Sequence, residues 1–210
     1  MTFARKATYT TGLFIVFFSF YFFLQHSIDT GNIDLILEID KSIPFMPEFV
    51  WVYHSIFFQV FLVMVCFIKD KKLFFNTFWS CVVCSMFLLF FYTVLPSFYP
   101  RVEFEITSLS TQLVDLTRTF DASNNTFPSG HVTFSWLMFL AMSKTRIARI
   151  QFGLAPLFLL WALGISLSTL VIKQHFLVDV MAGCTLAFTI FYVIDYFHDY
   201  ASSSQLLTFR

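Results

Sequence analysis

The sequence predicts an all-α protein made of six helices that cross a membrane. Of its 210 residues, 58% are hydrophobic and 12% are charged, whereas soluble domains carry about 25% charged residues. A helix needs about 20 predominantly apolar residues to cross the hydrocarbon core of a bilayer. Six stretches reach or approach that length, namely residues 8–25, 48–68, 73–95, 128–143, 151–171 and 175–197. We therefore expect one integral membrane domain that covers residues 1–210.

Several helix boundaries are marked in the sequence. Pro47 precedes the second stretch and Pro96 follows the third, and proline cannot continue a helix because it lacks a backbone N–H. The fourth stretch is the shortest and carries polar residues. Residues 30–43 mix apolar and acidic side chains, a pattern that could form a short interfacial helix. Residues 96–127 form a long polar connection.

The Lys and Arg residues are divided unequally between the two ends of the predicted helices. With six spans, the side of the N-terminus holds nine of them: Arg5, Lys6, Lys69, Lys71, Lys72, Lys144, Arg146, Arg149 and Arg210. The other side holds four: Lys41, Arg101, Arg118 and Lys173. Because cytoplasmic loops carry the excess of Lys and Arg, we expect both termini in the cytoplasm. The 96–127 connection and the turn at 172–175 then lie on the outer side.

The charge balance and the cysteines argue against several other classes of protein. A formal net charge of zero gives no support for nucleic-acid binding. All four cysteines fall in apolar segments, so the disulfide framework of a small secreted domain is not expected. Cys81 and Cys84 have the spacing of a metal or redox motif, but no second ligand pair is nearby in the sequence. We expect both to be buried small apolar residues.

A candidate anion site lies where the outer connection meets the fourth stretch. Pro128 suits the first turn of a helix. The N–H groups of Ser129, Gly130 and His131 would then point out of the positive end of that helix, an arrangement that binds anions such as phosphate. His131 adds a titratable side chain beside this anion site.

A second candidate cluster lies at the turn between the last two stretches. His175 and Asp179 are four residues apart, so on one helix they share a face. The carboxylate can accept the imidazole N–H, which fixes the tautomer and makes the other ring nitrogen the better nucleophile. Asp179 also lies inside an apolar helix, where an ionisable residue is costly and by default suggests function.

The two clusters together resemble the second and third signature motifs of the type-2 phosphatidic acid phosphatase superfamily. The resemblance covers roughly residues 90–185, which we take as the motif-bearing core. Asp121 with Asn125, and the run from Asp179 to Gly183, also look like this family. These features resemble most closely the branch that includes inositol phosphorylceramide synthases.

The resemblance implies a fold, an activity and a role for each residue. The fold would be the six-helix membrane bundle of the phosphatase and haloperoxidase type. His175 would attack phosphorus to form a phosphohistidine, Asp179 would orient it, and His131 would protonate the departing alcohol. Ser129 and Gly130 would hold phosphate oxygens, with no metal ion or other cofactor. The expected substrate is a phosphomonoester or diphosphate of a lipid, and the other expected partner is the bilayer.

The sequence departs from the family pattern where cationic phosphate ligands are expected. The first motif reads Lys-x6-Arg-Pro in many members, but here Val94 stands at the Lys position, and Arg101 is followed by Val102. The third motif usually begins Ser-Arg, and here Thr169 replaces the Arg. Arg101 and Lys173 are the candidate phosphate ligands on the outer side, and Arg118 is a weaker one.

Two alternatives to a phosphohydrolase follow from the same residues. One is a lipid phosphotransferase, in which a lipid alcohol replaces water as the acceptor. The other is a non-catalytic membrane protein that binds a lipid phosphate.

His54 is expected to be a packed or interfacial residue. For location, we expect a bacterial cytoplasmic membrane, with the site facing the periplasm or exterior.

Overall fold

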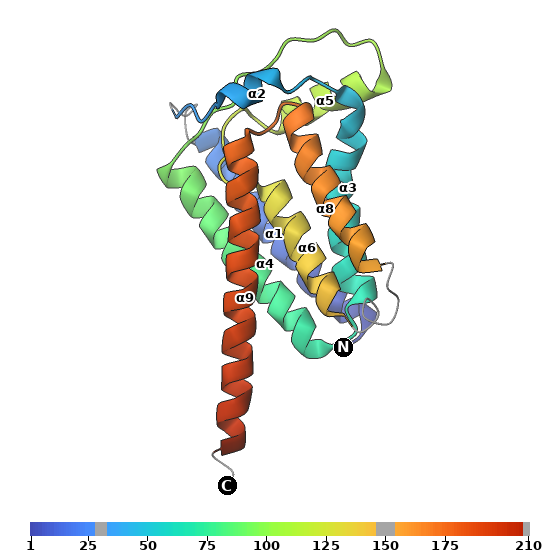
Figure 1. Ribbon diagram of the computed structural model, residues 1–210, viewed down its shortest axis with the longest axis vertical. Coiled ribbons are helices and arrows are strands. Elements are labelled where there is room, and N and C mark those ends of the chain that lie inside the picture. Colours follow the sequence, from blue (N-terminus) through green and yellow to red (C-terminus); the bar gives the residue numbers. More distant parts are fainter. Residues whose placement is uncertain (28–32, 146–153, 208–210) are drawn as a thin grey trace.

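Long helices packed side by side form the body of the molecule in the computed structural model (Figure 1). It describes residues 1–27, 33–145 and 154–207. The helices of these ranges are α1 (Phe3–Ser27), α2 (Glu38–Ser42), α3 (Val50–Phe61), α4 (Lys71–Val94), α5 (Leu109–Phe120), α6 (Gly130–Lys144), α8 (Leu154–Val171) and α9 (Leu177–Leu207). A 3₁₀ turn, η1 (Pro47–Phe49), precedes α3, and a π-helical segment, η2 (Leu62–Phe67), continues it. The predicted all-α class is therefore confirmed for the described residues.

Five segments of the described chain are long and apolar enough to cross a membrane. They are Phe3–Ser27, Pro47–Phe67, Lys71–Val94, Leu154–Val171 and Leu177–His198. They correspond to five of the six predicted stretches, although residues 151–153 of the fifth stretch lie outside the described residues. The chain thus has the architecture of an integral multi-pass membrane protein.

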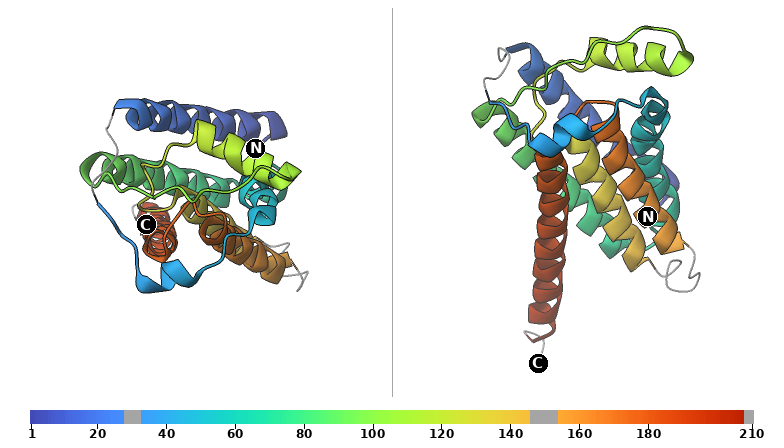
Figure 2. Two further views of the ribbon diagram at one scale, coloured as in Figure 1. Left: turned by 90° about the horizontal axis from the view of Figure 1, so that it is seen from above. Right: turned by 45° about the horizontal axis from the view of Figure 1, so that its top comes forward.

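The remaining predicted stretch, the fourth (residues 128–143), corresponds to α6, which is shorter than a typical span. Its 15 residues extend about 22 Å, against a hydrocarbon thickness of about 30 Å. The helix lies in the middle of the bundle, in contact with α3, α4, α8 and α9 (Figures 1 and 2). Its neighbours bury it, so α6 does not need the length or the uniform apolar surface of a helix that faces lipid.

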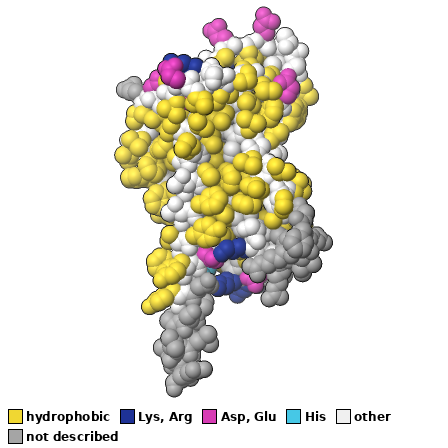
Figure 3. Space-filling model, in the orientation of Figure 1, with side chains coloured by type: hydrophobic (Ala, Val, Ile, Leu, Met, Phe, Trp, Pro, Cys, Tyr) yellow, Lys and Arg dark blue, Asp and Glu magenta, His cyan; other side chains and the backbone are white. Residues whose placement is uncertain are grey.

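The face of the molecule shown in Figure 3 has an apolar belt between two charged ends. At one end α1 and α4 begin and α6 ends, which gathers Lys6, Lys71 and Lys144 there (Figure 1). Lys6 is buried and its ammonium donates to the carbonyls of Val65 and Ile68, at 2.5 and 2.9 Å. Of the nine Lys and Arg residues expected on this side, Arg146, Arg149 and Arg210 lie outside the described residues.

The opposite end, where α6 and α9 begin, carries two short helices. Helix α2 falls within the segment 30–43, whose pattern could form an interfacial helix and of which residues 30–32 lie outside the described residues. The connection 96–127 contains α5, which the sequence reading missed. Helix α5 packs on α3 and η1, with Val114 buried against Val50 and Tyr53. Both short helices lie across this end of the bundle, which we call the site end (Figures 1 and 2).

The two cysteines of the Cys81-x-x-Cys84 pair are fully buried and free. They lie on α4 within the main apolar core, beside Leu88 and Leu137. This agrees with their interpretation as small apolar residues.

Candidate active site

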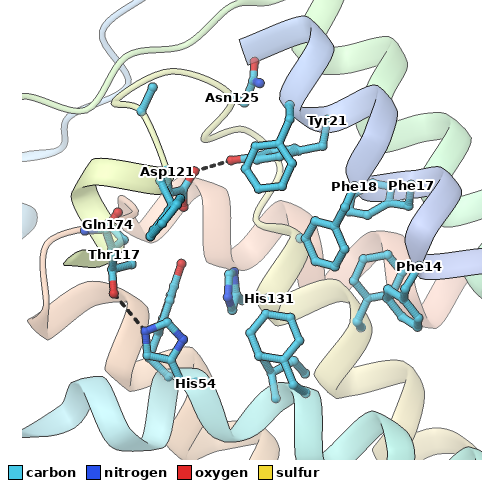
Figure 4. Close-up of a pocket in the computed structure, with 18 of the residues that line it drawn as sticks. Phe14, Phe17, Phe18, Tyr21, His54, Thr117, Asp121, Asn125, His131 and Gln174 are labelled. Carbon is cyan, nitrogen blue, oxygen red and sulfur yellow. Dashed lines mark hydrogen bonds between the residues drawn. The ribbon is translucent and has the colours of Figure 1, made fainter. Parts of the chain in front are cut away.

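The first turns of α6 and α9 bring the two sequence motifs together at the site end. His131 is the second residue of α6, and His175 lies two residues before α9 begins. The centroids of the two imidazole rings are 6.5 Å apart, with an angle of 56° between the rings. Both rings line a cavity of about 570 Å³, in which His131 occupies a central position (Figure 4).

His175 and Asp179 form the expected pair, although His175 lies in the turn before α9 and not on one helix with Asp179. The Asp179 Oδ2 lies 3.4 Å from the His175 Nδ1 and accepts a hydrogen bond from the backbone N–H of Phe176 at 2.9 Å. Asp179 is fully buried, and His175 is 8% exposed. Because the carboxylate faces Nδ1, the Nε2 atom of His175 is the nitrogen left for chemistry.

A close approach of α6 and α9 fixes the two motifs relative to each other. The Ser129 N–H donates to the Asp179 carbonyl at 3.1 Å, and the Thr133 hydroxyl lies 3.2 Å from the Gly183 carbonyl. A Cβ atom at Gly183 would lie 2.7 Å from the Ser129 carbonyl oxygen. Any larger residue at position 183 would therefore push α6 and α9 apart, and with them the helix starts next to which the two histidines lie.

Ser129 and Gly130, both expected to bind phosphate, have different surroundings. Ser129 is fully buried, and its hydroxyl caps α6 by accepting from the Val132 N–H at 3.4 Å. Its own N–H is occupied by Asp179. Gly130 instead lines the cavity beside His131 and the Tyr92 hydroxyl, which bonds to the Gly130 backbone, so α6 presents its N-terminus to the cavity at Gly130.

Aromatic packing holds His131 in place. Its ring stacks on Tyr53 of α3, with the centroids 3.9 Å apart and the planes at 22°. Next to Tyr53, His54 also lines the cavity, and its Nε2 lies 2.8 Å from the Thr117 hydroxyl of α5 (Figure 4). His54 was expected to be a packed residue; it is packed, and it also forms part of the cavity wall.

Arg101 is the guanidinium that reaches the cavity. Its Nη1 donates to the Gln174 Oε1 at 2.9 Å, and its Nη2 donates to the Asp121 carbonyl. Arg101, Gln174 and Asp121 all line the cavity. Burial lowers the pKa of Arg101 below its usual value, while the nearby Asp121 opposes that change. An arginine remains charged under both influences.

Lys173 and Arg118, the other two candidate cations, are directed elsewhere. The Lys173 ammonium donates to the Asp40 carbonyl at 3.1 Å, and Lys173 is not among the residues that line the cavity. The Arg118 Nη1 donates to the Val102 carbonyl at 2.6 Å, while its guanidinium lies over the Phe104 ring. Proximity along the sequence suggested Lys173 because it precedes His175 by two residues. Its backbone is in the left-handed region, with φ of 60°, and the turn directs the side chain to Asp40.

Asp40 of α2 holds the segment around α2 against the start of α9 through hydrogen bonds. Its Oδ1 accepts from the Leu177 N–H at 2.9 Å, which caps the first turn of α9, and its Oδ2 accepts from the Leu37 N–H at 2.8 Å. Asp40 is 4% exposed. No role for Asp40 was predicted from the sequence, because its partners at the site, Leu177 and Lys173, are 137 and 133 positions away in the chain.

A carboxylate, Asp121, also lines the head of the cavity. It accepts a hydrogen bond from the hydroxyl of Tyr21 on α1 (Figure 4). Burial raises the pKa of the Asp121 carboxyl above its usual value, while the Tyr21 hydroxyl, His175 and Arg101 act in the opposite direction. The sequence signalled Asp121 only through the family resemblance, and it gave no signal for Tyr21.

The cavity continues from this polar head into an apolar groove between α1 and α3. The groove walls are aromatic and aliphatic side chains of these two helices: Phe14, Ile15, Phe18, Phe22, Phe57, Val60 and Phe61. Along α1 the lining runs from Thr10 to Phe22, which is about 18 Å of helix. Ile15 and Phe57 remain 62% and 52% exposed, so the groove opens sideways, in the direction in which lipid would lie.

Comparison with protein families gives a match for the PAP2 superfamily over residues 94–203. The chain belongs to the PAP2 superfamily. The matched range contains Arg101, His131 and His175, which line the cavity head, and Asp179, which lies against His175. No curated protein matches the chain.

Membership of the PAP2 superfamily and the apolar helices are typical of a membrane phosphatase-type protein. They agree with a lipid-related substrate and with insertion in a bilayer. The head of the cavity provides two imidazoles, one guanidinium and a helix N-terminus, which are groups that bind and transfer phosphoryl groups.

Proposed function

We propose that this PAP2 protein is a lipid phosphatase that hydrolyses a phosphomonoester or diphosphate of a lipid through a phosphohistidine. The observation that carries the proposal is the continuity of the cavity. His131 and His175 lie at its polar head, and its apolar groove runs between α1 and α3 toward the lipid. A lipid phosphate has the same two parts, a charged end and a hydrocarbon chain.

In the proposed reaction, His175, Asp179 and His131 each have a separate role. His175 Nε2 attacks phosphorus and the bond to the departing alcohol breaks, while Asp179 stabilises the charge that develops on the ring. His131 gives a proton to the departing oxygen. Water then attacks the phosphohistidine, His131 takes its proton, and inorganic phosphate leaves. We propose that neither step requires a metal ion.

Phosphate binding is proposed to centre on Arg101 and the N-terminus of α6 at Gly130. Arg101 is held by Gln174 and by the Asp121 carbonyl, and it still has further N–H groups to donate. Ser129 supports this site by capping α6 and bonding to Asp179, and Lys173 supports it by bonding to Asp40. We therefore favour Arg101 and Gly130 over Ser129 and Lys173 as direct ligands.

For topology, we propose six spans with both termini in the cytoplasm and the site on the outer side. The Lys residues of α1, α4 and α6 lie at the end of the bundle opposite His131 (Figure 1). An excess of Lys and Arg marks the cytoplasmic side of membrane proteins. A cysteine introduced at position 110 on α5 should be labelled from outside intact cells; labelling only after permeabilisation would reverse the orientation.

The test of function is phosphate release by the purified full chain in detergent. Wild-type protein should release phosphate from lipid phosphomonoesters in the presence of a chelator, and His175→Ala should lose about 10³-fold or more of that activity. His131→Ala should lose about 10²–10⁴-fold. Release that persists in His175→Ala, or no release by wild type from any lipid phosphate, would rule out this mechanism.

A phosphotransferase is the second candidate, and one observation favours it. Asn125 lines the cavity head with an amide group that has no hydrogen-bond partner within the described residues. Such a group can bind the hydroxyl of an acceptor alcohol as well as a phosphate oxygen. Adding candidate lipid alcohols to the same assay and looking for a phosphorylated product distinguishes transfer from hydrolysis.

A further inference from the structure

The head of the cavity contains buried amide groups whose hydrogen-bonding capacity is unused. Asn125 is 3% exposed and Gln174 is 5% exposed. No partner within the described residues bonds to either polar atom of the Asn125 side chain or to the Gln174 Nε2. Both residues line the cavity (Figure 4). A buried polar group without a partner is costly, so these atoms indicate a ligand that supplies the missing bonds.

The orientation of the Gln174 amide is fixed by its neighbour. Arg101 can only donate hydrogen bonds, and its Nη1 lies 2.9 Å from the Gln174 Oε1. The amide oxygen must therefore face Arg101, which leaves the NH₂ group as a donor without a partner. A group of that kind binds an acceptor, such as a phosphoryl oxygen.

The backbone of Asn125 has an uncommon conformation that asparagine accepts. Its φ is 60°, in the left-handed region that asparagine tolerates better than most residues. Asn125 lies in the connection that leads from α5 to α6, five positions before Gly130. The Asn125 amide thus reaches the cavity from the connection before α6, while the Gln174 amide reaches it from the turn before α9.

The charges around these amides are nearly balanced. Among the described residues that line the cavity, Arg101 is the single Lys or Arg, and Asp121 contributes a carboxylate. Val94 and Thr169 occupy the places where the family resemblance led us to expect cations. A phosphomonoester carries a charge of about −1.5 to −2 at neutral pH, which one guanidinium opposed by a carboxylate compensates poorly.

We propose that Asn125 and Gln174 form a neutral clamp that binds phosphoryl oxygens together with Arg101, so that the site selects a singly charged phosphoryl group. Such a group is a phosphomonoester that has taken up a proton, and a phosphodiester carries the same single charge. The Asp121 carboxylate disfavours a doubly charged phosphoryl group because it repels the second negative charge. This proposal rests on the proposed function, since it assigns the substrate class of the same site.

The test measures binding and turnover separately, with the full chain in detergent. Two probes share one chain and differ in charge: dodecylphosphonate, and its monomethyl ester. At about pH 9 the first carries two negative charges and the second carries one. Binding is followed as the rise in the thermal unfolding midpoint with probe concentration.

Removal of either amide should weaken binding of both probes. Gln174→Ala and Asn125→Gly should each lower affinity by about tenfold or more, as expected for a hydrogen bond to a charged group. Glycine retains the left-handed backbone at position 125. Gln112→Ala is the matched control, because Gln112 is an exposed amide on α5 that does not line the cavity.

Removal of the carboxylate charge should change the selectivity instead. Asp121→Asn should strengthen binding of the doubly charged probe by about tenfold and leave the ester within about threefold. Asp115→Asn removes the same charge from an exposed position on α5 and should change neither affinity. A merely structural role of Asp121 would alter both probes equally, which would contradict the selection.

Unchanged affinities in the folded amide variants would overturn the clamp. If either amide variant fails to fold, Gln174→Met and Asn125→Asp retain side-chain length and the left-handed backbone. Gln174→Met should weaken both probes, and Asn125→Asp should weaken the doubly charged probe more than the ester. Probe binding as described without any turnover would refute the proposed function alone, whereas turnover with unchanged probe binding would refute the clamp alone.

Discussion

The polar head and the apolar groove of the cavity are built in different ways. Hydrogen bonds hold the head: Asp179 bonds to the Phe176 N–H and lies against His175, and Ser129 bonds to the Asp179 carbonyl. Side chains such as Ile15 and Phe57 line the groove, half exposed, without directional contacts. Phosphoryl transfer needs atoms at fixed positions, whereas burial of a hydrocarbon chain needs only apolar area. Mutations in the head should therefore affect every substrate, and mutations in the groove should affect lipids alone.

The largest effect is expected at Asp179. Asp179→Asn should lower kcat by about 10³-fold or more for both lipid and soluble phosphate esters, because the His175 ring loses the charge that stabilises it. Rates on a lipid phosphate and on phenyl phosphate check this. Asp195→Asn is the control, since Asp195 lies on the same helix but pairs with Lys144 far from the head. Equal rates for Asp179→Asn and wild type would remove Asp179 from the mechanism.

The second effect tests how closely the two motifs must be held. In Gly183→Ala the added Cβ would lie 2.7 Å from the Ser129 carbonyl oxygen, so α6 and α9 must separate. A displacement of about 1 Å can cost about 10²-fold in rate, and we expect that loss on both substrates. Gly164→Ala, where the nearest atom would lie 3.5 Å away, should retain full activity. Full activity of Gly183→Ala would mean that the helix spacing is not limiting.

The third effect should be confined to the groove. Ile15→Asn removes apolar surface that a lipid chain would cover, and loss of such a contact is worth about 1.5–3 kcal/mol, or roughly tenfold or more in KM for a long-chain substrate. Rates on phenyl phosphate should stay unchanged. Val16→Asn is the matched control, because Val16 is similarly exposed on α1 but does not line the cavity. An equal change for both variants would argue against lipid in this groove.

The smallest effect concerns pH and stability rather than activity. Burial raises the pKa of the Asp121 carboxyl, so the folded protein holds this proton more tightly than the unfolded chain does. Stability from this group is complete below the ordinary carboxyl pKa and is lost as pH rises through the raised value. Asp121→Asn should therefore raise the unfolding midpoint by roughly a few degrees at neutral pH, with a smaller gain in acid. A gain that grows in acid would contradict the sign of this shift.

Much of the fold was predictable because a helix that crosses a bilayer requires a long apolar stretch, which is easily recognised in a sequence. Five predicted stretches correspond to helices of spanning length, and Cys81 and Cys84 are buried as expected. Helix α5 was missed, since residues 96–127 are polar overall and the apolar face that contacts Val50 and Tyr53 is short. The short length of α6 was also not predicted, because the length of a helix buried among other helices does not need to match the thickness of the bilayer.

The sequence by itself determined the candidate site residues: His131 at a helix start, and His175 four residues before Asp179. Local spacing points to them, because the groups at a helix N-terminus and two side chains four residues apart at the start of a helix are set by neighbours in the chain. Tertiary structure alone decided which charges join them. It turned Lys173 toward Asp40, brought Arg101 beside Gln174, and placed Tyr21 against Asp121. These contacts join residues up to 133 positions apart, and no local pattern encodes such a distance.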